Sequence, residues 1–456
     1  MSHDAQVIVI GAGVSGITTA WALKQAGIRS IVLEGRPRIG GRMHSSYKWK
    51  DVPVDLGASW VSHLPINPLV DVARTHKIGL KKSDLFNLNL NEADGHSLDD
   101  EHINDLLLGL GVVYSAVKLE AEQRRGRGQP DVALSEVLPG VVDGLKLNKK
   151  TQRGVEFFLN LTITEAYAAD FRDLSLYEWD DDSTTAPLGW YVVPGGYVKI
   201  LDVLKKGLDI RLEQVVTTIR HDADGVIVHT RDGDDYRAPY AVITVPHGVL
   251  AKNLIRFEPK LPPWKQAAID RIRTGLSDKF WFLFPRKFWK SSRDVVGRID
   301  PDGKGRWSTW LNFHRYTKHP VLMVFNRTEH AEALEGMTDE AVIKEAMEVL
   351  RAEFGPNTPE PIDMQRSTWL SDPFSCGTLP HLPPGATSED HRTLARPVGR
   401  LRFAGDSTHA DLPGLVLGAF FSGIREAEKL IEILYLDRLR PFHSPRIKVG
   451  APVTSD

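Results

Sequence analysis

Three glycines near the amino terminus have the residue types and spacing of a nucleotide-binding turn. Gly11, Gly13 and Gly16 fit the pattern G-x-G-x-x-G, and Glu34 follows 34 − 11 = 23 positions after the first of them, near the spacing of about 20 residues in dinucleotide sites. Gly11 permits a tight turn, Gly13 lets the backbone approach a pyrophosphate, and Gly16 lets a helix pack closely on a strand. The helix amino terminus offers N–H groups and a partial positive charge to phosphates. Glu34 is expected to accept hydrogen bonds from a ribose.

A lysine in an apolar segment is the second candidate for chemistry. Lys279 lies in the run D-K-F-W-F-L-F at residues 278–284. Burying a charged group in such a strand is unfavourable unless the group has a partner or a task. A catalytic role is one explanation. The alternative is a lysine at a strand edge whose ammonium group reaches solvent.

The elements that must position these residues follow a βαβ pattern. Residues 7–10 are a short apolar, β-branched run typical of a buried parallel strand, and residues 30–33 form a second run of this kind. A helix over residues 17–25 joins them. The pattern returns near the end of the chain, where a strand over residues 401–405 precedes a long helix over residues 414–434.

The middle of the chain is predicted to combine paired strands with longer helices. Alternating polarity and Asp/Gly turns indicate paired strands between residues 207 and 246, and Thr338 is the predicted N-cap of a helix. These elements are strands over residues 209–212, 215–220, 225–230, 241–245 and 280–284, and helices over residues 100–125 and 336–354.

The composition is that of a globular protein with more than one domain. The chain has 456 residues, of which 42% are hydrophobic, and this length exceeds the usual limit of about 250–300 residues for one core. With 57 Lys+Arg against 59 Asp+Glu, the net charge of −2 argues against nucleic acid as a general partner. Cys376 is the one cysteine, which excludes an intramolecular disulfide and a metal site built from several cysteines.

The sequence favours a cytoplasmic protein without a membrane partner. Its first residues, M-S-H-D, lack the basic start and apolar core of a signal peptide. No apolar run reaches the ~18 residues that a membrane-spanning helix needs. The oligomeric state is left open, with a homodimer among the options, and no metal site is predicted.

Motifs after the second predicted strand resemble one family. R-x-G-G-R occupies residues 38–42, G-A-S-W residues 57–60, F-A-G-D residues 403–406, and G-L-V-L-G-A residues 414–419. In these motifs and their order, the chain is similar to the flavin-dependent amine oxidase superfamily. Within it, the chain most resembles polyamine oxidases, monoamine oxidases and the catalytic domain of histone lysine-specific demethylases.

The resemblance implies an α/β fold in which a discontinuous, Rossmann-type FAD-binding domain meets a second, α+β substrate-binding domain. The active site would lie where the two domains meet. The FAD-binding domain would comprise residues 1–80, 201–260 and 395–436, the substrate domain residues 81–200 and 261–394, and a C-terminal tail residues 437–456.

The resemblance also implies bound FAD and the residues that would hold it. Asp406 would lie near the ribityl–pyrophosphate, at a position where many relatives carry glutamate. The other residues are Gly11, Gly13, Gly16, Glu34, Gly41 and Arg42 at the ADP half, Val216 at the adenine, Gly57, Ala58, Ser59, Trp60 and Val416 at the isoalloxazine, and Trp369 and Gly405 completing the set.

The FAD is expected to be noncovalent. Some relatives link FAD to a cysteine in the segment that follows a family tryptophan. Alignment from Trp369 places Thr378, not Cys376, at the linking position. Cys376 is then an ordinary small residue.

The implied reaction is the oxidation of a primary or secondary amine, either polyamine-like or bulky and aliphatic. A hydride would pass from the α-carbon to flavin N5, molecular oxygen would be reduced to hydrogen peroxide, and water would hydrolyse the imine to an aldehyde or ketone. An apolar pocket favours the neutral amine that this step needs. In the family the matching lysine holds a water against flavin N5, so Lys279 is the expected catalytic residue.

The substrate pocket departs from the family at two positions. Relatives usually place two aromatic side chains before the flavin, and the matching positions here carry Leu379 and Leu415. Leucine lacks the π face that attracts a cation, which weakens a polyamine assignment. If the alignment is shifted, Trp60, Trp190 and Phe421 are the aromatics that would serve instead.

Two further polar groups are candidates for the pocket. Glu165, with Asp170 and the run at residues 180–182, would fix a distal amino group, although charged runs are usually solvated. His63 would line the entrance, and a surface position is the alternative.

Three other functions stay open at this stage. A flavin-dependent dehydrogenase or desaturase of a biosynthetic pathway would use an acceptor other than oxygen. A chromatin demethylase module is disfavoured because no long helical insertion is visible in the sequence. An FAD-binding scaffold without catalysis is the third.

Overall fold

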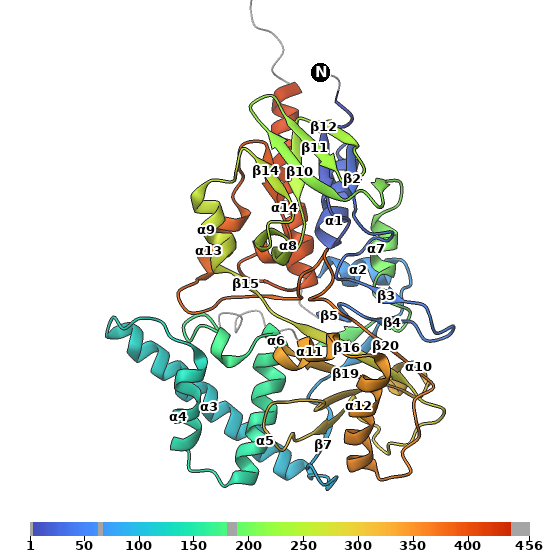
Figure 1. Cartoon of the computed structure of the whole chain (residues 1–456), viewed down its shortest axis with the longest axis vertical. Coiled ribbons are helices and arrows are strands. Elements are labelled where there is room, and N and C mark those ends of the chain that lie inside the picture. The colour runs from blue at the N-terminus through green and yellow to red at the C-terminus, as the bar shows by residue number, and fades with distance from the viewer. Residues whose placement is uncertain (1–2, 63–66, 180–188, 439–456) are drawn as a thin grey trace, which may run out of the picture.

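Two lobes make up the computed structural model, which describes residues 3–62, 67–179 and 189–438. In Figure 1 the first lobe contains helices α1 (Val14–Gln25) and α14 (Val416–Arg438), and the second contains α3 (Asp100–Gly126) and α12 (Asp339–Phe354). The chain crosses between the lobes several times. Most of the predicted C-terminal tail, residues 439–456, lies outside the described residues.

A five-stranded parallel sheet forms the centre of the first lobe. Its order is β22-β13-β1-β2-β9, so β1 lies in the middle. Alternate residues of β1 belong to different cores: Val7 and Val9 pack with α1 and α14, while Ile8 and Ile10 face the opposite side. A strand buried on both faces must be apolar throughout, which explains the V-I-V-I run. The strands are β1 (Val7–Ile10), β2 (Ser30–Leu33), β9 (Asp209–Arg211), β13 (Tyr240–Ile243) and β22 (Leu401–Phe403).

The prediction of paired strands between residues 207 and 246 was partly wrong. Strands β10 (Val216–His221), β11 (Val226–Thr230) and β12 (Asp235–Ala238) do form an antiparallel meander, with β14 (Arg256–Glu258) parallel to β10. The first and last predicted strands instead became β9 and β13 and joined the parallel sheet, and β12 was not predicted. All four residues of β13 are buried, as a central parallel strand requires, so its apolar run was the missed signal.

A six-stranded mixed sheet forms the centre of the second lobe. Its order is β20-β16-β19-β18-β17-β7, and only the β17–β7 pair is parallel. One face packs on α12 and the other on α3, α4 and α5. The remaining bounds are β7 (Leu88–Asn91), β16 (Ser277–Leu283), β17 (Val295–Arg298), β18 (Thr309–Asn312), β19 (Val321–Arg327), β20 (Asp363–Arg366), α4 (Leu134–Gly144), α5 (Lys149–Leu159) and α11 (Thr328–Glu335).

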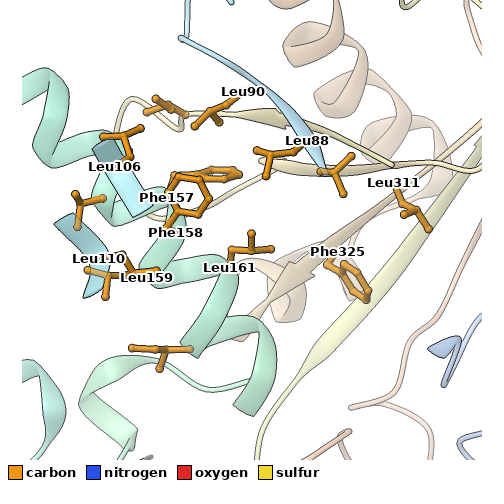
Figure 2. Close-up of a cluster of buried hydrophobic side chains, with 14 of the residues drawn as sticks. Leu88, Leu90, Leu106, Leu110, Phe157, Phe158, Leu159, Leu161, Leu311 and Phe325 are labelled. Atoms are coloured by element: carbon orange, nitrogen blue, oxygen red, sulfur yellow. The ribbon is translucent and has the colours of Figure 1, made fainter. Parts of the chain in front are cut away.

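The larger core of this lobe lies between the mixed sheet and the α3–α5 layer. Figure 2 shows leucines from α3 and β7 meeting Phe157 and Phe158 of α5, with Phe325 of β19 at one side of the cluster. The two long helices predicted in this lobe are confirmed. The hydroxyl of Thr338 accepts a hydrogen bond from the Ala341 N–H at 3.3 Å, so Thr338 is the N-cap of α12.

A small sheet joins the two lobes beside the site. Its order is β5-β8-β6, with β5 (Trp60–Ser62), β8 (Trp190–Val192) and β6 (Lys81–Ser83) antiparallel in turn. This sheet pairs residues on both sides of the predicted domain boundary at residue 80. The predicted domain boundaries stay a prediction. The remaining elements are β3 (Ser45–Ser46), β4 (Val54–Asp55), β15 (Arg273–Thr274), β21 (Pro380–His381), α2 (Pro68–Thr75), η1 (Asn160–Thr164), α6 (Glu165–Tyr167), η2 (Phe171–Asp173), α7 (Lys199–Leu204), α8 (His247–Ala251), α9 (Pro263–Arg271), α10 (His314–Thr317), α13 (Ser388–Ala395) and η4 (Asp406–Thr408).

Candidate active site

One cavity of about 530 Å³ brings most of the predicted residues together. It runs from the carboxyl ends of the parallel strands to the first residues of β16 and the last residues of β19 in the mixed sheet. This is where open α/β sheets bind their ligands. The predicted residues on its wall are Gly11, Gly13, Glu34, Gly41, Arg42, Gly57, Ala58, Ser59, Trp60, Glu165, Val216, Lys279, Trp369, Leu379, Gly405, Asp406, Leu415 and Val416.

The three glycines of the first turn differ in what surrounds them. Gly11 has a φ of +104°, a conformation that glycine adopts without strain. A Cβ at Gly16 would lie 1.9 Å from the Gly11 carbonyl oxygen, so this position needs glycine for α1 to pack on the turn, and Gly16 is not on the cavity wall. A Cβ at Gly13 would meet no protein atom within 4 Å. The space at Gly13 is therefore open for a ligand.

Glu34, at the end of β2, is buried and held by two backbone donors. One carboxylate oxygen accepts the Ala12 N–H at 2.7 Å and the other accepts the Arg36 N–H at 2.9 Å. Each carboxylate oxygen has a second acceptor position. The carboxylate therefore retains capacity for a ligand hydroxyl on the cavity wall.

Arg42 and Asp406 form an ion pair on the cavity wall, although they lie 364 positions apart. Arg42 also donates to the carbonyl oxygen of Thr378. The second carboxylate oxygen of Asp406 is buried and has no hydrogen-bond partner among the described residues. Buried polar atoms are normally satisfied. An unpaired acceptor on the cavity wall fits a ligand rich in hydroxyl or N–H groups, as the ribityl chain and flavin of FAD are.

The tryptophan of the predicted set is fixed by the strand that carries the lysine. Trp369 donates through Nε1 to the Leu56 carbonyl at 3.1 Å, and its N–H donates to Asp278 at 3.2 Å. Asp278 lies on the face of β16 opposite to Lys279, and desolvation raises the pKa of its carboxyl to about 8. Asp278 therefore positions the Trp369 segment and lies off the cavity wall.

Lys279 points into the cavity because side chains alternate along β16. Its amino group donates to the Gly57 carbonyl and the Ser59 hydroxyl, and it lies 5.1 Å from the ring centroid of Trp60 and 5.3 Å from that of Phe325. Only 6% of the residue is exposed. Desolvation lowers the pKa of Lys279 to about 7, against the charge of Asp55, which raises it. The exposed strand-edge alternative is therefore excluded.

Aromatic rings lie beside the lysine, and leucines line the cavity that it enters. Trp60 and Phe325 stack with ring centroids 5.6 Å apart and planes inclined at 28°. Leu379 and Leu415 lie on the same cavity wall, as does Trp190. Phe421, the other aromatic considered, is not on the wall and packs against Phe420.

Glu165 carries a charge that is already compensated. It follows η1, a π-helical turn of the kind often found at functional sites. Its carboxylate lies 2.5 Å from the guanidinium of Arg327, and the two side chains are 11% and 4% exposed. Desolvation raises the pKa of Glu165, and Arg327 opposes this shift.

Asp170 and Cys376 also lie off the cavity wall, and other predicted residues cannot be placed. Asp170 caps η2 by accepting the Arg172 N–H at 3.1 Å, away from the cavity wall. Cys376 is buried with its sulfur 3.6 Å from the Pro373 carbonyl and is also off the wall. His63 and residues 180–182 lie outside the described residues.

Several residues of the site were not predicted from the sequence. Arg327 ends the apolar strand V-L-M-V-F-N-R, the same signal that identified Lys279, and Phe325 is the cross-strand neighbour of Lys279. Arg36 is buried at the nucleotide end, where it pairs with Asp372 at 2.5 Å. Which strand lies beside β16 depends on sheet order, so the contact of Phe325 with Lys279 had no local signal.

No group of three or more His, Cys, Asp or Glu side chains suited to a metal ion occurs within residues 3–62, 67–179 and 189–438. Within the same ranges, none of the helices has the length and apolar character needed to span a bilayer.

The parallel sheet, the glycine turn and the cavity leading to a buried lysine define a two-lobed, dinucleotide-binding oxidoreductase. Residues 14–431 match the family model described as flavin containing amine oxidoreductase, and the chain belongs to this family. It is therefore an amine-oxidising enzyme whose cofactor is FAD. The expected superfamily, the α/β fold and the cofactor are confirmed.

Known proteins resemble the chain over most of its length. Polyamine oxidase 2 of Arabidopsis thaliana is 34% identical over 441 residues, which cover 94% of this chain and 88% of that protein. Lysine-specific histone demethylase 1 homolog 2 of A. thaliana is 32% identical over 442 residues, covering 94% of this chain and 59% of that protein. The solved cyclohexylamine oxidase from Brevibacterium oxydans IH-35A shares the fold with a TM-score of 0.76 at 22% identity, covering 95% of this chain and 100% of that one.

Proposed function

We propose that the protein oxidises an amine with one amino group on an apolar body and passes the electrons to molecular oxygen. An amine, oxygen and water would give an aldehyde or ketone, ammonia or a smaller amine, and hydrogen peroxide. The observation that carries the proposal is the position of Lys279. Its buried amino group contacts Trp60 and Phe325 in a cavity continuous with the dinucleotide turn.

Bound FAD supplies the two-electron oxidation of the C–N bond. The turn at Gly11 and Gly13, the Glu34 carboxylate and the Arg42–Asp406 pair would hold it, because these groups offer open space, an acceptor and a charged pair along one wall. The protein residues bind the amine, exclude water and hold a proton.

The cavity favours the neutral form of a substrate amine. An alkylamine has an ordinary pKa of about 10. Desolvation lowers the pKa of Lys279 to about 7, and it lowers the pKa of an amine that enters beside it in the same direction. An ammonium group carries three N–H bonds, of which Gly57 and Ser59 accept two from Lys279. The third N–H, or the lone pair of the neutral form, is available to a water molecule in the cavity.

The charges near Lys279 favour a substrate with a single amino group. Glu165 would attract a distal ammonium, but Arg327 neutralises it at 2.5 Å. Lys279 adds positive charge whenever it is protonated. Leu379 and Leu415 provide apolar surface without a π face for a cation. A polycation would therefore lose its hydration here without a compensating anion.

The polyamine relatives support amine oxidation but argue for a more highly charged substrate. The name of polyamine oxidase 2 of A. thaliana gives polyamines as the substrate class of that protein. The Glu165–Arg327 pair is the reason that we prefer a monoamine for this chain. Dehydrogenase activity with another acceptor is the second candidate, and oxygen consumption separates the two.

An amine panel tests the proposal on the purified holoenzyme. Benzylamine, hexylamine, putrescine and spermidine are supplied in air, and amine consumed and peroxide released are both measured. The proposal predicts one peroxide for each amine oxidised, with higher kcat/KM for the two monoamines. Turnover that needs an artificial acceptor and yields no peroxide would establish the dehydrogenase instead.

Noncovalent FAD is part of this proposal. Thr378, at the linking position, has a hydroxyl that donates to the Gly275 carbonyl at 3.0 Å and accepts the Ser277 N–H at 3.0 Å. Acid precipitation should release all of the flavin into the supernatant. Yellow colour retained in the protein pellet would show a covalent link.

A further inference from the structure

A second pocket lies on the surface of the substrate lobe, outside the site described above. It has a volume of about 430 Å³ and is formed by β6, the segment after β16, the last residue of β18, and α10 with the residue that follows it. Its lining residues are Lys81, Lys82, Lys287, Ser291, Ser292, Asn312, His314, Arg315, Tyr316 and Lys318.

The pocket concentrates positive charge in a protein whose net charge is −2. Its lining contains four lysines and one arginine, and none of the ten described lining residues is Asp or Glu. Arg315 pairs with Asp294 at 2.9 Å, and Lys287 donates to the Ser291 carbonyl at 3.0 Å. The ammonium groups of Lys81, Lys82 and Lys318 are exposed and make no hydrogen bond or ion pair with a described residue. Like charges gathered in a concavity create a local field that attracts an anion.

The floor of the pocket is held rigidly. Asn312 is completely buried, and its amide donates to the Arg293 carbonyl at 2.9 Å and the Ser291 carbonyl at 3.3 Å. Its carbonyl oxygen accepts from Trp289 Nε1 at 2.9 Å. The backbone between α10 and the segment after β16 is therefore fixed before any ligand binds, which lowers the entropy lost on binding.

Hydrogen bonds connect this pocket to the wall of the active-site cavity. Asp294, which holds Arg315, also accepts from the Tyr316 hydroxyl. That hydroxyl lies 3.0 Å from the Ser83 hydroxyl, which accepts from Trp60 Nε1 at 3.1 Å. Tyr316 lines the basic pocket, and Trp60 lines the cavity beside Lys279. Four consecutive polar contacts thus join the two sites.

We propose that the basic pocket binds a small molecule that carries two or more phosphate groups, and that its occupancy is transmitted to Trp60 through Tyr316 and Ser83. Lysine ammonium groups are common ligands for phosphate. A concave site of this volume fits a small molecule better than it fits the broad surface of a membrane or of duplex DNA. Binding at this pocket does not depend on the proposed oxidase function.

Calorimetric titration of the holoenzyme with tripolyphosphate tests the binding. FAD already fills the cofactor cavity in this form, so its own phosphate site is not available to the probe. We expect saturable binding of one tripolyphosphate per chain, weakened when ionic strength rises to about 1 M, where the Debye length falls to about 3 Å. Inorganic phosphate should bind more weakly, because it contacts fewer of the lysines. No saturable heat at low salt would overturn the site.

The variant Lys82→Ala/Lys318→Ala locates the binding. Loss of two charge-assisted contacts should weaken tripolyphosphate binding by roughly tenfold to a hundredfold. Lys344→Ala, which removes an exposed lysine of α12, is the matched control and should bind as the wild type does. Equal affinities in all three proteins would overturn the assignment to this pocket. Their FAD content, read from visible absorbance, confirms folding.

Competing anions and the amine KM complete the test. Phosphatidylserine vesicles or duplex DNA that bind more tightly than tripolyphosphate, through the same lysines, would overturn the small-molecule assignment. Saturating tripolyphosphate should change the KM for hexylamine in the wild type and leave it unchanged in Lys82→Ala/Lys318→Ala. Tight binding with an unchanged KM and unchanged flavin spectrum would contradict the link to Trp60 and leave the site itself in place.

Discussion

At the scale of single residues, the site depends on a cation that folding has removed from water. Lys279 is held by the Gly57 carbonyl and the Ser59 hydroxyl rather than by a direct carboxylate partner. Desolvation therefore dominates and lowers the pKa of the amino group to about 7. A lysine that changes protonation near neutral pH can hold or release a proton during turnover.

Replacing Lys279 with Met tests its part in catalysis. The variant keeps most of the side-chain volume but removes the amino group that would hold water and a proton. We expect the oxygen-dependent half-reaction to slow by a factor on the order of 10², with a smaller effect on the amine-dependent half-reaction. Stopped-flow measurement of each half-reaction checks this, and equal oxygen rates in both proteins would remove Lys279 from the mechanism.

The same residue predicts a pH dependence of stability. The folded pKa of Lys279 lies near 7 and the unfolded pKa near 10.4, so the unfolded chain binds the extra proton between these values. The contribution of Lys279 to the free energy of unfolding must therefore rise with pH in this window. Between about pH 8 and about pH 10, wild type should gain about 1.4 kcal/mol per pH unit relative to Lys279→Met. Denaturant unfolding of both proteins measures the difference, and parallel pH profiles would contradict the lowered pKa.

Arg327 is predicted to control the charge of the substrate. In Arg327→Met the Glu165 carboxylate loses its partner, so a distal ammonium can take that place. The KM for putrescine should fall roughly tenfold relative to that for hexylamine, since one charged contact is worth about 1.4 kcal/mol or more. Steady-state kinetics with both amines provide the measurement.

The double variant Glu165→Gln/Arg327→Met controls for loss of structure. Breaking a buried ion pair at one end costs about 3–5 kcal/mol, whereas replacing both partners can be nearly neutral. The double variant should therefore be more stable than Arg327→Met and should lose the gain in putrescine affinity. The same gain in both variants would show that pocket size, not charge, sets the preference.

At the scale of elements, the glycines in the turn between β1 and α1 are needed for different reasons. Gly16 makes room for the Gly11 carbonyl, whereas Gly13 borders empty space in the protein. Glycine at position 16 is therefore needed for folding, and glycine at position 13 is needed for cofactor binding.

This division predicts opposite behaviour for two small substitutions. Gly13→Ala should leave the apo protein as stable as wild type, because its Cβ meets no protein atom, yet weaken FAD binding. Gly16→Ala should destabilise even the apo protein, because its Cβ would lie 1.9 Å from a backbone oxygen. Thermal unfolding of the apo proteins and FAD titration separate the effects. Gly79→Ala, also in open space, is the control, and reduced FAD affinity there would undermine the comparison.

Helices, strands and turns that have a clear local sequence pattern were predictable. The neighbouring elements against which they pair or pack were not. The apolar run at β1, the cap of α12 by Thr338 and the glycine turn each depend on neighbouring residues, so sequence pattern predicted them. The apolar run of β13 indicated a strand buried on both faces, but which distant strands lie beside β9 and β13 is encoded by no local pattern. Arg327 carried the same signal as Lys279 but meets Glu165 only after α6 docks on β19.

At the scale of the whole molecule, the cavity lies between the carboxyl ends of the parallel strands and the adjoining ends of β16 and β19 in the mixed sheet. The parallel sheet contributes the nucleotide end through the turns after β1, β2, β13 and β22, and the mixed sheet contributes the reacting end through β16 and β19. The ion pair between Arg42 and Asp406 joins segments far apart in the chain. The cofactor would thus bind between segments that are distant in the sequence. Because FAD binds the folded chain and not the unfolded chain, its binding should stabilise the whole fold by mass action.

Anaerobic mixing of the purified yellow holoenzyme with hexylamine tests the central claim most directly. The account predicts that the visible absorbance of the bound flavin bleaches as the amine is oxidised, and that air restores it with release of hydrogen peroxide. A flavin that stays oxidised with hexylamine, benzylamine, putrescine and spermidine alike would contradict the account.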